Sequence, residues 1–458
     1  MPFQNRLKFF CGAAVFSLGL LMSSSSRAQS VSLPPQVPSS SVDSSSVSRR
    51  AKPTPYDSIF PQTEYLGPTI GVSSSAPASP LNDFLWGHSH WLKDHQISIS
   101  GWVDAGYNAS SSNHSNEPMT YDIVPNSVQL DQAVLQAERL PDTVQTDHVD
   151  WGFQFDGLYG MDYRYTTAQG YFSQQLLQQN KLYGFDPVVA NVQVYVPQIA
   201  EGTLFTIGRY ISPADIEAQF APQNFLYTHS LMFSYDAYTQ TGVNAAVKFN
   251  DTWTLLLGVD AGDDIAPWAP AAQPTGLAML RWVSPSNNDS LWGGADSVNN
   301  GQFTANHDNL QEFNLTWSHR FNPGFFTETE AYYLDQWNAY MGGTCNFGPL
   351  TAFGGGGCGA FIPGMSTAWG AVNYTEYKLD DNNFLSVRND WLDDVNGERT
   401  GFASQYASWT VGITHQFSAL TEIRPEIRYE RSLTGALPYN DGTKRDQYTF
   451  NMDIIQSF

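Results

Sequence analysis

A run of alternating charges near the end of the chain carries the clearest chemistry in the sequence. Five charged residues of mixed sign occupy every second position there, opposite mostly apolar neighbours: Glu422, Arg424, Glu426, Arg428 and Glu430. On an extended strand they share one face. That face cannot meet lipid, because an Arg near the bilayer midplane costs about 2–4 kcal/mol. The charges therefore indicate a polar interior, either as a transverse field that orients permeating solutes or as a self-satisfied network that keeps a wall polar.

Further charged residues are expected on inward faces elsewhere in the chain. These pore-lining candidates are Asp104, Asp156, Asp162, Arg164, Arg281, Glu312, Glu328, Glu330 and Arg388. Glu328 and Glu330 could in principle form the carboxylate pair of a glycosidase. Two same-face positions on one strand are more simply explained as pore lining, so we expect no catalytic residue.

The connection 211–238 is the candidate for a constriction. Long connections without regular structure are usually functional, and the aromatic side chains of this one would be exposed if it lay outside. An external cap is the alternative. We expect the connection to fold into the lumen through these candidates: Asp215, Glu217, Phe220, Phe225, Tyr227 and His229.

The elements that must position these residues are strands of period two. In 151–165, large apolar side chains such as Trp151 and Phe155 alternate with polar ones such as Asp156, which is typical of a half-buried strand. The pattern predicts strands near 97–108, 128–138, 151–165, 188–196, 203–210, 239–249, 252–261, 275–283, 290–298, 308–321, 324–338, 366–378, 383–391, 403–417, 420–431 and 446–458. We therefore predict an all-β fold, a transmembrane antiparallel β-barrel of about 16 strands.

Connection lengths give an independent test of this fold. Tight turns at Asn250-Asp251, Asn322-Pro323 and Ser418-Ala419 alternate with long connections such as 211–238 and 339–365. Outer-membrane barrels combine short periplasmic turns with long external loops. We expect the same arrangement over a barrel domain of residues 96–458.

The N-terminal region directs the chain out of the cytosol. Arg6 and Lys8 precede the uncharged, mostly apolar stretch 9–22, and Ser26-Arg27-Ala28 offers a cleavage site, as in a signal peptide over 1–28. Residues 29–58 are rich in Ser and Pro and are expected to be a disordered tether. Residues 59–95 are expected to be a periplasmic lead-in segment.

Charge and cysteine content narrow the function. The formal net charge is −22, which argues against nucleic acid as a partner and predicts a cation-preferring pore. Cys345 and Cys358 are expected to form a local disulfide in an oxidising compartment, with free thiols as the alternative. His88, His90 and His95 lack a nameable fourth ligand, so we expect no metal and no cofactor.

The last strand places apolar residues on one face up to the C-terminal Phe. These residues are Tyr448, Phe450, Met452, Ile454 and Phe458. A terminal strand of this kind resembles the signal that outer-membrane proteins present to the barrel-assembly machinery.

Several segments resemble the OmpL-like β-barrel porin-2 family over about residues 96–458. The matching segments are Leu130–Ala133 with Glu138-Arg139, Gly152–Gly160, Ile207–Tyr210 with Ser212-Pro213, Tyr227–Leu231, Arg424–Tyr429 and Lys444–Phe450. The resemblance implies an outer-membrane pore and gives no substrate.

The expected function is an outer-membrane porin for passive diffusion of ions and small hydrophilic solutes, and not an enzyme. Its expected partners are outer-membrane lipid, lipopolysaccharide, the assembly machinery and, by analogy, two further copies in a homotrimer. One alternative is a barrel enzyme, although His319 and His415 have no obvious Ser nucleophile nearby. The other is a secreted soluble β protein that binds carbohydrate.

Overall fold

A computed structural model gives the fold of the chain. It describes residues 70–71, 79–213, 215–286, 288–343 and 359–458. The predicted signal peptide, the tether and the expected Cys345–Cys358 disulfide lie outside the described residues.

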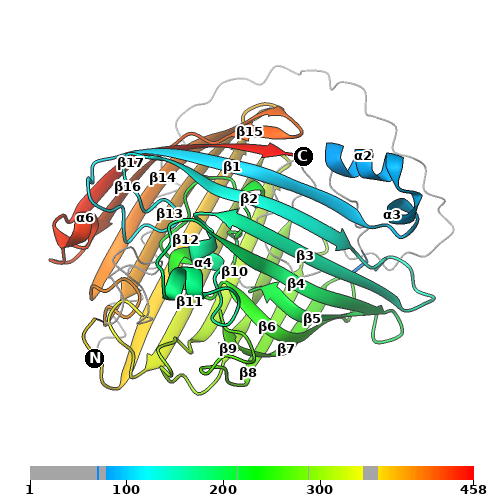
Figure 1. The fold of residues 1–458 in the computed structure, drawn as a ribbon, viewed down its shortest axis with the longest axis horizontal. Coiled ribbons are helices and arrows are strands. Elements are labelled where there is room, and N and C mark those ends of the chain that lie inside the picture. The colour runs from blue at the N-terminus through cyan, green and yellow to red at the C-terminus, as the bar shows by residue number, and fades with distance from the viewer. Residues whose placement is uncertain (1–69, 72–78, 214, 287, 344–358) are drawn as a thin grey trace. The chain divides into compact units, whose positions relative to one another are not determined.

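The described residues form a closed antiparallel barrel (Figure 1). Its strands are β1 (Ser98–Ser110), β2 (Val128–Arg139), β3 (Asp150–Gly160), β4 (Gly184–Val196), β5 (Thr203–Ile211), β6 (Thr239–Lys248), β7 (Trp253–Asp263), β8 (Thr275–Val283), β9 (Asp289–Val298), β10 (Gln311–Asn322), β11 (Phe325–Trp337), β12 (Met365–Lys378), β13 (Asn383–Asp394), β14 (Ser404–Ser418), β15 (Thr421–Ile423), β16 (Glu426–Ser432) and β17 (Asp446–Ser457). Each strand pairs with its neighbours in the chain, and β1 closes the barrel on β17, from Trp102 opposite Ser457 to Ser110 opposite Thr449.

The closed barrel has 16 strands, as the sequence predicts. β15 and β16 are two parts of one wall strand, since both pair with β14 and with β17. The break falls at Arg424 and Pro425, where proline has no N–H to give to a ladder.

One predicted strand is too long. The segment 151–165 was expected to continue as a strand to Tyr165, but β3 ends at Gly160 and helix α4 (Tyr163–Thr166) follows. β3 keeps its inward–outward alternation up to its end, with Phe155 and Tyr159 exposed and Asp156 and Leu158 buried. The chain leaves the strand after Gly160, and Tyr163 and Tyr165 are therefore buried inside, and not on the outer face as alternation predicts.

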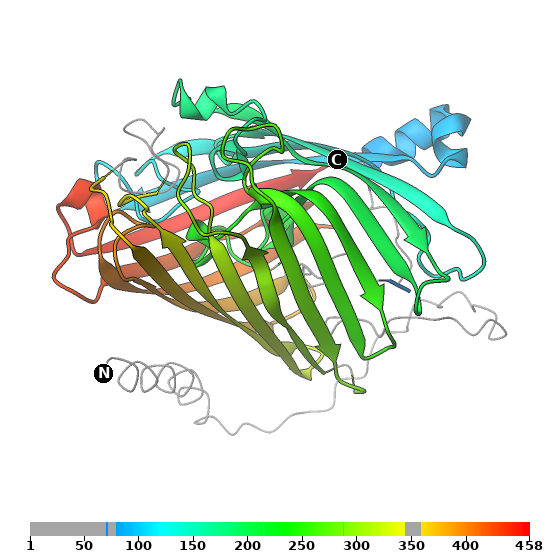
Figure 2. The ribbon, with the colours of Figure 1, turned by 90° about the horizontal axis from the view of Figure 1, so that it is seen from below.

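The connections divide by length between the two ends of the barrel (Figure 2). The end with the chain's short turns, here called the short-turn end, holds connections such as 249–252, 323–324 and 379–382. The long-loop end holds 111–127, 161–183, 212–238, 264–274, 299–310, 338–364, 395–403 and 433–445. This alternation of short and long connections agrees with the arrangement expected from the sequence.

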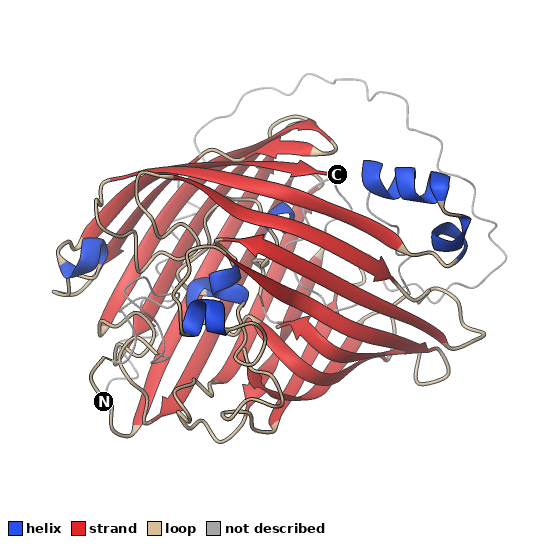
Figure 3. Ribbon diagram, viewed as in Figure 1, coloured by secondary structure: helices blue, strands red, loops and turns tan. Residues whose placement is uncertain are grey.

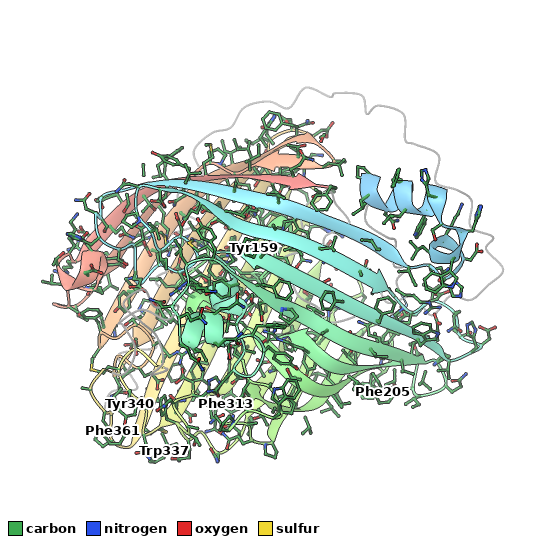
Figure 4. The ribbon with its side chains drawn as sticks, in the orientation of Figure 1. Tyr159, Phe205, Phe313, Trp337, Tyr340 and Phe361 are labelled. Carbon is green, nitrogen blue, oxygen red and sulfur yellow. The ribbon has the colours of Figure 1, made fainter. Side chains whose placement is uncertain are left out.

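Side chains divide between a polar interior and an apolar outer surface. The outward residues are exposed and apolar: Val192 and Ile207 are each 49% exposed, while the inward Gln193 and Thr206 beside them are buried. Figure 4 marks Tyr159, Phe205 and Phe313 on this outer surface. Exposed apolar side chains around a closed barrel match a lipid-facing band.

Helices are short and few beside the strands (Figure 3). They are α2 (Pro80–His88), α3 (His90–Asp94), α4, α5 (Gln174–Leu177), α6 (Tyr439–Gly442) and the 3₁₀ turns η1 (Ala221–Gln223) and η2 (Phe233–Tyr235). Within the described ranges, none of the helices has the length and apolar character needed to cross a membrane.

Helices α2 and α3 occupy part of the predicted lead-in segment and were not predicted. Ser79 caps α2 by accepting from the Asn82 N–H, and its hydroxyl donates to the Phe458 carbonyl at 2.8 Å. Trp86 Nε1 donates to the Ile97 carbonyl at 2.7 Å. These bonds fix the helix beside the seam where the first and last strands meet.

Candidate functional site

The connection between β5 and β6 lies inside the barrel. All six residues predicted for the constriction, Asp215, Glu217, Phe220, Phe225, Tyr227 and His229, are buried. Their neighbours in the connection bond to inward side chains of strands far apart in the chain. The Ile216 N–H donates to Glu330 Oε2 on β11 at 2.8 Å, and the Ala221 N–H donates to Gln132 Oε1 on β2 at 3.1 Å. We call residues 212–238 the internal loop.

The internal loop is held mainly from one side of the lumen. Its hydrogen bonds to the wall fall largely on β2, β10, β11, β13, β14 and β16 and on Arg424 at the β15–β16 break. We call β1, β2 and β10–β17 the loop-bearing wall. Phe225, Leu226 and Met232 pack there in one buried cluster with residues of β11–β14, whereas Phe220 and Phe233 join a second cluster with residues of β1–β4. The opposite side, β3–β7, is called the open wall.

Arg388 and Glu217 form the central attachment of the loop. Arg388 Nη1 lies 3.4 Å from Glu217 Oε1 and also donates to the Thr228 carbonyl, while Nη2 donates to Thr228 Oγ1 at 3.1 Å. Glu217 also accepts from the Tyr374 hydroxyl at 2.7 Å and from the Ser230 N–H at 2.8 Å. A buried ion pair with this many further hydrogen bonds has its desolvation compensated.

The alternating charges of the last strands hold the loop as well. Arg424 Nη1 donates to the carbonyls of Ala221 at 2.7 Å and Asn224 at 2.8 Å, and its guanidinium pairs with Asp453 on β17. Glu426 Oε2 accepts from the backbone N–H of Tyr227 at 3.1 Å. Arg424, Glu426 and Arg428 of this run thus bond to the loop, while Glu422 Oε1 and Arg428 Nε have no hydrogen-bond partner among the described residues.

Glycines on the loop-bearing wall make room for the loop. A Cβ at Gly106 on β1 would overlap the Tyr227 hydroxyl, and one at Gly412 on β14 would overlap the Leu226 side chain. A Cβ at Gly370 on β12 would overlap Met232. Glycine within a strand commonly marks a close approach of this kind. These inward glycines are the sequence signal that would have located the loop's binding surface.

The electrostatics of the loop differ along its length. Burial alone would raise the pKa of Glu217, but the His229 ring at 3.6 Å and the Arg388 guanidinium hold it at about 2. By contrast, burial and the neighbouring carboxylate of Glu330 raise the pKa of Asp215 well above its ordinary value. Burial, with the charge of Asp215, does the same to the pKa of Asp236. The loop thus carries one firmly charged carboxylate and two that take up protons readily.

The predicted pore-lining residues lie on the inside of the barrel, but not all on its wall. Those on strands or at the β15–β16 break are Asp104, Asp156, Arg281, Glu312, Glu328, Glu330, Arg388, Glu422, Arg424, Glu426, Arg428 and Glu430; Glu422 is half-buried and the rest are buried. Asp162 and Arg164 were expected on a strand and instead follow the end of β3. Arg164 on α4 bonds within its own connection, to the Lys181 carbonyl at 2.8 Å.

Other buried charges were missed by the sequence reasoning. Arg209 on β5 pairs with Asp186 on β4 at 2.9 Å, and Arg399 pairs with Asp308 at 2.8 Å across two long connections. Alternation from the outward Ile207 would place Arg209, two residues further on, on the outer face, so the strand pattern does not predict its burial. Nothing local in the sequence indicates the Arg399 pair, because its partners come from different connections.

Two cavities border the internal loop. One lies against the open wall, where Gln154, Asn191, Gln193, Thr206 and Asn244 face Phe220 and Gln223 of the loop, with an open volume of about 620 Å³. We call it the amide cavity. The other, of about 470 Å³, lies at the long-loop end and includes Asp236, Asp263, Asp264, Asp308 and Arg399. We call it the acidic cavity.

A short N-terminal segment packs inside the short-turn end of the open wall. Ile70 is 3% exposed and joins a buried apolar cluster with Tyr195, Leu204, Leu256 and Trp292. The Gly71 N–H donates to Thr143 Oγ1 at 3.2 Å. The polar lumen therefore ends at an apolar patch that this segment covers.

A closed 16-stranded barrel with a lipid-facing exterior, a polar interior and a long connection folded inside it has the architecture of an outer-membrane porin. The chain belongs to the family described as "Putative beta-barrel porin-2, OmpL-like", whose model matches residues 96–458. It is thus an outer-membrane β-barrel.

Solved structures give matches at low sequence identity. The trimer form of OmpT from Vibrio cholerae is 9% identical, with 79% of this chain and 99% of that chain covered and a TM-score of 0.47. An anion-selective porin from Comamonas acidovorans is 10% identical over 79% and 99%, with a TM-score of 0.49. The channel DcaP of Acinetobacter baumannii is 10% identical over 79% and 97%, with a TM-score of 0.45. No curated protein sequence matches the chain.

Proposed function

We propose that this porin allows passive diffusion of ions and small hydrophilic solutes, with a preference for cations, along the open wall. The observation that carries the proposal is the placement of the internal loop. It narrows the lumen from the loop-bearing wall and leaves the amide cavity beside β3–β7. The pore-lining and constriction residues named above then form two groups. One group holds the internal loop in place, and the other borders the solute path along the open wall.

The preference for cations is inferred from the charges at the long-loop end. Asp236, Asp263, Asp264 and Asp308 border the acidic cavity, with Arg399 as its cation and His307 beside it. A cavity lined mostly by one sign of charge concentrates counter-ions at its entrance. The cation preference is therefore assigned to the acidic cavity, because the charged residues of the loop-bearing wall are bonded to the loop.

Planar bilayers test the proposal directly. The purified protein is expected to form stable unit conductances in KCl, and its reversal potential in a salt gradient is expected to show K⁺ passing more readily than Cl⁻. Deleting 214–226 is expected to raise the unit conductance, because it removes the part of the loop that faces the amide cavity. Absence of unit conductance, or clear anion selectivity, would contradict the respective part of the proposal.

The proposed surroundings of the barrel are outer-membrane lipid and lipopolysaccharide, reached after cleavage near Ala28. The outward Tyr448, Phe450 and Ile454 support recognition by the assembly machinery, as they are exposed on the last strand. The sequence-based expectation of a homotrimer is tested by the mass of the protein in mild detergent. A catalytic role is not proposed, because His319 Nδ1 contacts Asp289 at 2.6 Å and His415 Nδ1 contacts Asn383 at 2.8 Å, and neither of these partners is a serine.

A further inference from the structure

The amide cavity has a chemical character different from the rest of the lumen. Its polar residues are cross-strand neighbours: Gln154 lies opposite Asn191, and Thr206 lies between Gln193 and Asn244. The residues that line it, all in the described part of the chain, carry no formal charge. On the loop-bearing wall, by contrast, Arg388, Glu426 and Arg428 are buried charged residues. A solute in the amide cavity therefore meets hydrogen-bonding groups, and none of the residues that line the cavity is charged.

The hydrogen-bonding capacity of the cavity is partly unused. Asn244 is 7% exposed, and its Oδ1 has no hydrogen-bond partner among the described residues. Gln193 Nε2 reaches Asn191 Oδ1 only at 3.4 Å. Each amide side chain offers both donors and an acceptor, and a buried amide without a partner is costly. A ligand that both donates and accepts would satisfy these groups.

Apolar surface completes the cavity. Phe220 reaches it from the loop, and its ring is fixed by an edge contact with Trp102, with centroids 5.1 Å apart at 75°. Tyr210, Val189 and Leu256 supply further apolar area from the open wall. The cavity thus combines polar side chains with apolar surface, as small-molecule sites do.

We propose that the amide cavity is a binding subsite for neutral polyhydroxylated solutes such as sugars. This rests on the proposed function, since the solute reaches the cavity through the pore. Sugar hydroxyls donate and accept, which matches the amides, and the C–H faces of a sugar ring pack on Phe220. An ionic solute would lose hydration without gaining a charged partner in this cavity. The acidic cavity concentrates cations, and the amide cavity retains neutral sugars.

The test compares two sugar readouts on the same preparation. Maltose is expected to reduce the unit conductance in KCl in a saturable way, whereas polyethylene glycol of similar mass reduces it without saturation. Saturation-transfer difference NMR on the folded protein in detergent is expected to detect maltose binding without relying on conduction. Asn244→Leu is expected to weaken both effects about fivefold, the loss expected for one hydrogen bond.

Two further variants separate the site from general damage. Gln223→Ala changes an exposed side chain of the loop and is expected to weaken maltose binding even if Asn244→Leu fails to fold. Gln336→Leu is the matched control. It removes a buried amide of β11 that has no hydrogen-bond partner among the described residues and does not line the cavity, and it is expected to leave maltose binding unchanged.

The outcomes are distinct. Unit conductance in KCl without any saturable maltose effect or NMR transfer would overturn the subsite and leave the pore intact. Equal weakening in Asn244→Leu and Gln336→Leu would also overturn the subsite. NMR transfer that Asn244→Leu weakens, without conductance, would support the subsite and contradict the proposed diffusion pore.

Discussion

The two walls of the lumen use polar residues in opposite ways. On the loop-bearing wall, ionised side chains such as Arg388, Arg424 and Glu426 are buried and bonded to the internal loop. On the open wall, amide and hydroxyl side chains such as Asn191, Thr206 and Asn244 border a cavity. Charged groups need partners when they are buried, so they suit a surface that holds another segment in place. Neutral polar groups suit a surface that a solute can approach and leave.

Among the variants considered, Arg388→Met should change the unit conductance most. It removes the cation beside Glu217 and the donor to Thr228, and loss of one partner of a buried ion pair costs about 3–5 kcal/mol. We expect the loop to detach, the unit conductance to rise, and the temperature of heat-induced unfolding in gel-shift assays to fall.

The matched control is Lys378→Met. Lys378 pairs with Asp381 at 2.8 Å at the short-turn end, where Asp381 is 87% exposed. Exposed pairs contribute about 0–1 kcal/mol, so the conductance should not change. An equal change in both variants would show that the buried pair has no special part in holding the loop.

Gly106→Ala tests the fit of the loop without changing any charge. The added methyl group overlaps the Tyr227 hydroxyl on the loop-bearing wall, and overpacking of this kind costs about 1–3 kcal/mol. We expect noisier, partly enlarged unit conductance in bilayers. Gly276→Ala on β8 is the control, because its Cβ would meet only Val298 O at 3.8 Å. Conductance equal to the unchanged protein in both variants would count against close packing of the loop.

Acidification should separate the loop's attachment from the pore's selectivity. Burial raises the pKa of Asp264, which lines the acidic cavity, to about 7, so this carboxyl loses its negative charge as the pH falls through that value. The lowered pKa of Glu217, about 2, stabilises the loop above its ordinary value near 4.5, and this contribution is lost only as pH falls from there toward 2. Reversal potentials should therefore show declining K⁺ preference from pH 8 to 5 at nearly constant unit conductance.

Asp264→Asn is the companion variant for the pH series. It removes the carboxyl of the acidic cavity whose pKa is raised to about 7, so the decline in K⁺ preference should become smaller. A rise in unit conductance over pH 8 to 5 would instead show that the loop detaches in this range, contrary to the expected ionisation of Glu217.

Ile70→Ser, at the short-turn end of the open wall, should change the unit conductance least. The change removes most of an apolar side chain buried against Tyr195 and Leu204, and so weakens the contact of residues 70–71 with the barrel. We expect a modest rise in unit conductance, smaller than for Arg388→Met. No rise would show that the segment does not narrow the path.

The sequence predicted the barrel well because its signals are local. Alternation fixed the strands within a few residues, and connection lengths identified the two ends. Prediction from the sequence failed where a residue packs against residues that are distant in the chain. Tyr163 and Tyr165 continue the alternation of β3, yet they are buried inside, where Tyr165 stacks on Tyr121 at 4.2 Å. Helices α2 and α3 were missed, although Ser79-Pro80 is a helix-start signal and Leu81, Phe84 and Leu85 lie at helical spacing.

The candidate site was predicted only in part for the same reason. Charged residues attract attention in a sequence, and the predicted set therefore lies mostly on the loop-bearing wall or in the loop. Gln193, Thr206 and Asn244 are common surface residue types, and only pairing between strands places them together. The amide cavity on the open wall therefore could not be predicted without knowing how the strands pair.

Thiol accessibility at two matched threonines tests the difference between the walls most directly. Thr206 borders the amide cavity, whereas Thr410 on β14 accepts a hydrogen bond from Arg388 at 3.1 Å beneath the loop. Each is replaced by cysteine in a background of Cys345→Ser and Cys358→Ser, and a charged thiol reagent is added during bilayer recording. We predict that Thr206→Cys reacts and its unit conductance falls, while Thr410→Cys does not react. Equal reaction at both positions, or reaction at Thr410→Cys alone, would contradict an open path along β3–β7.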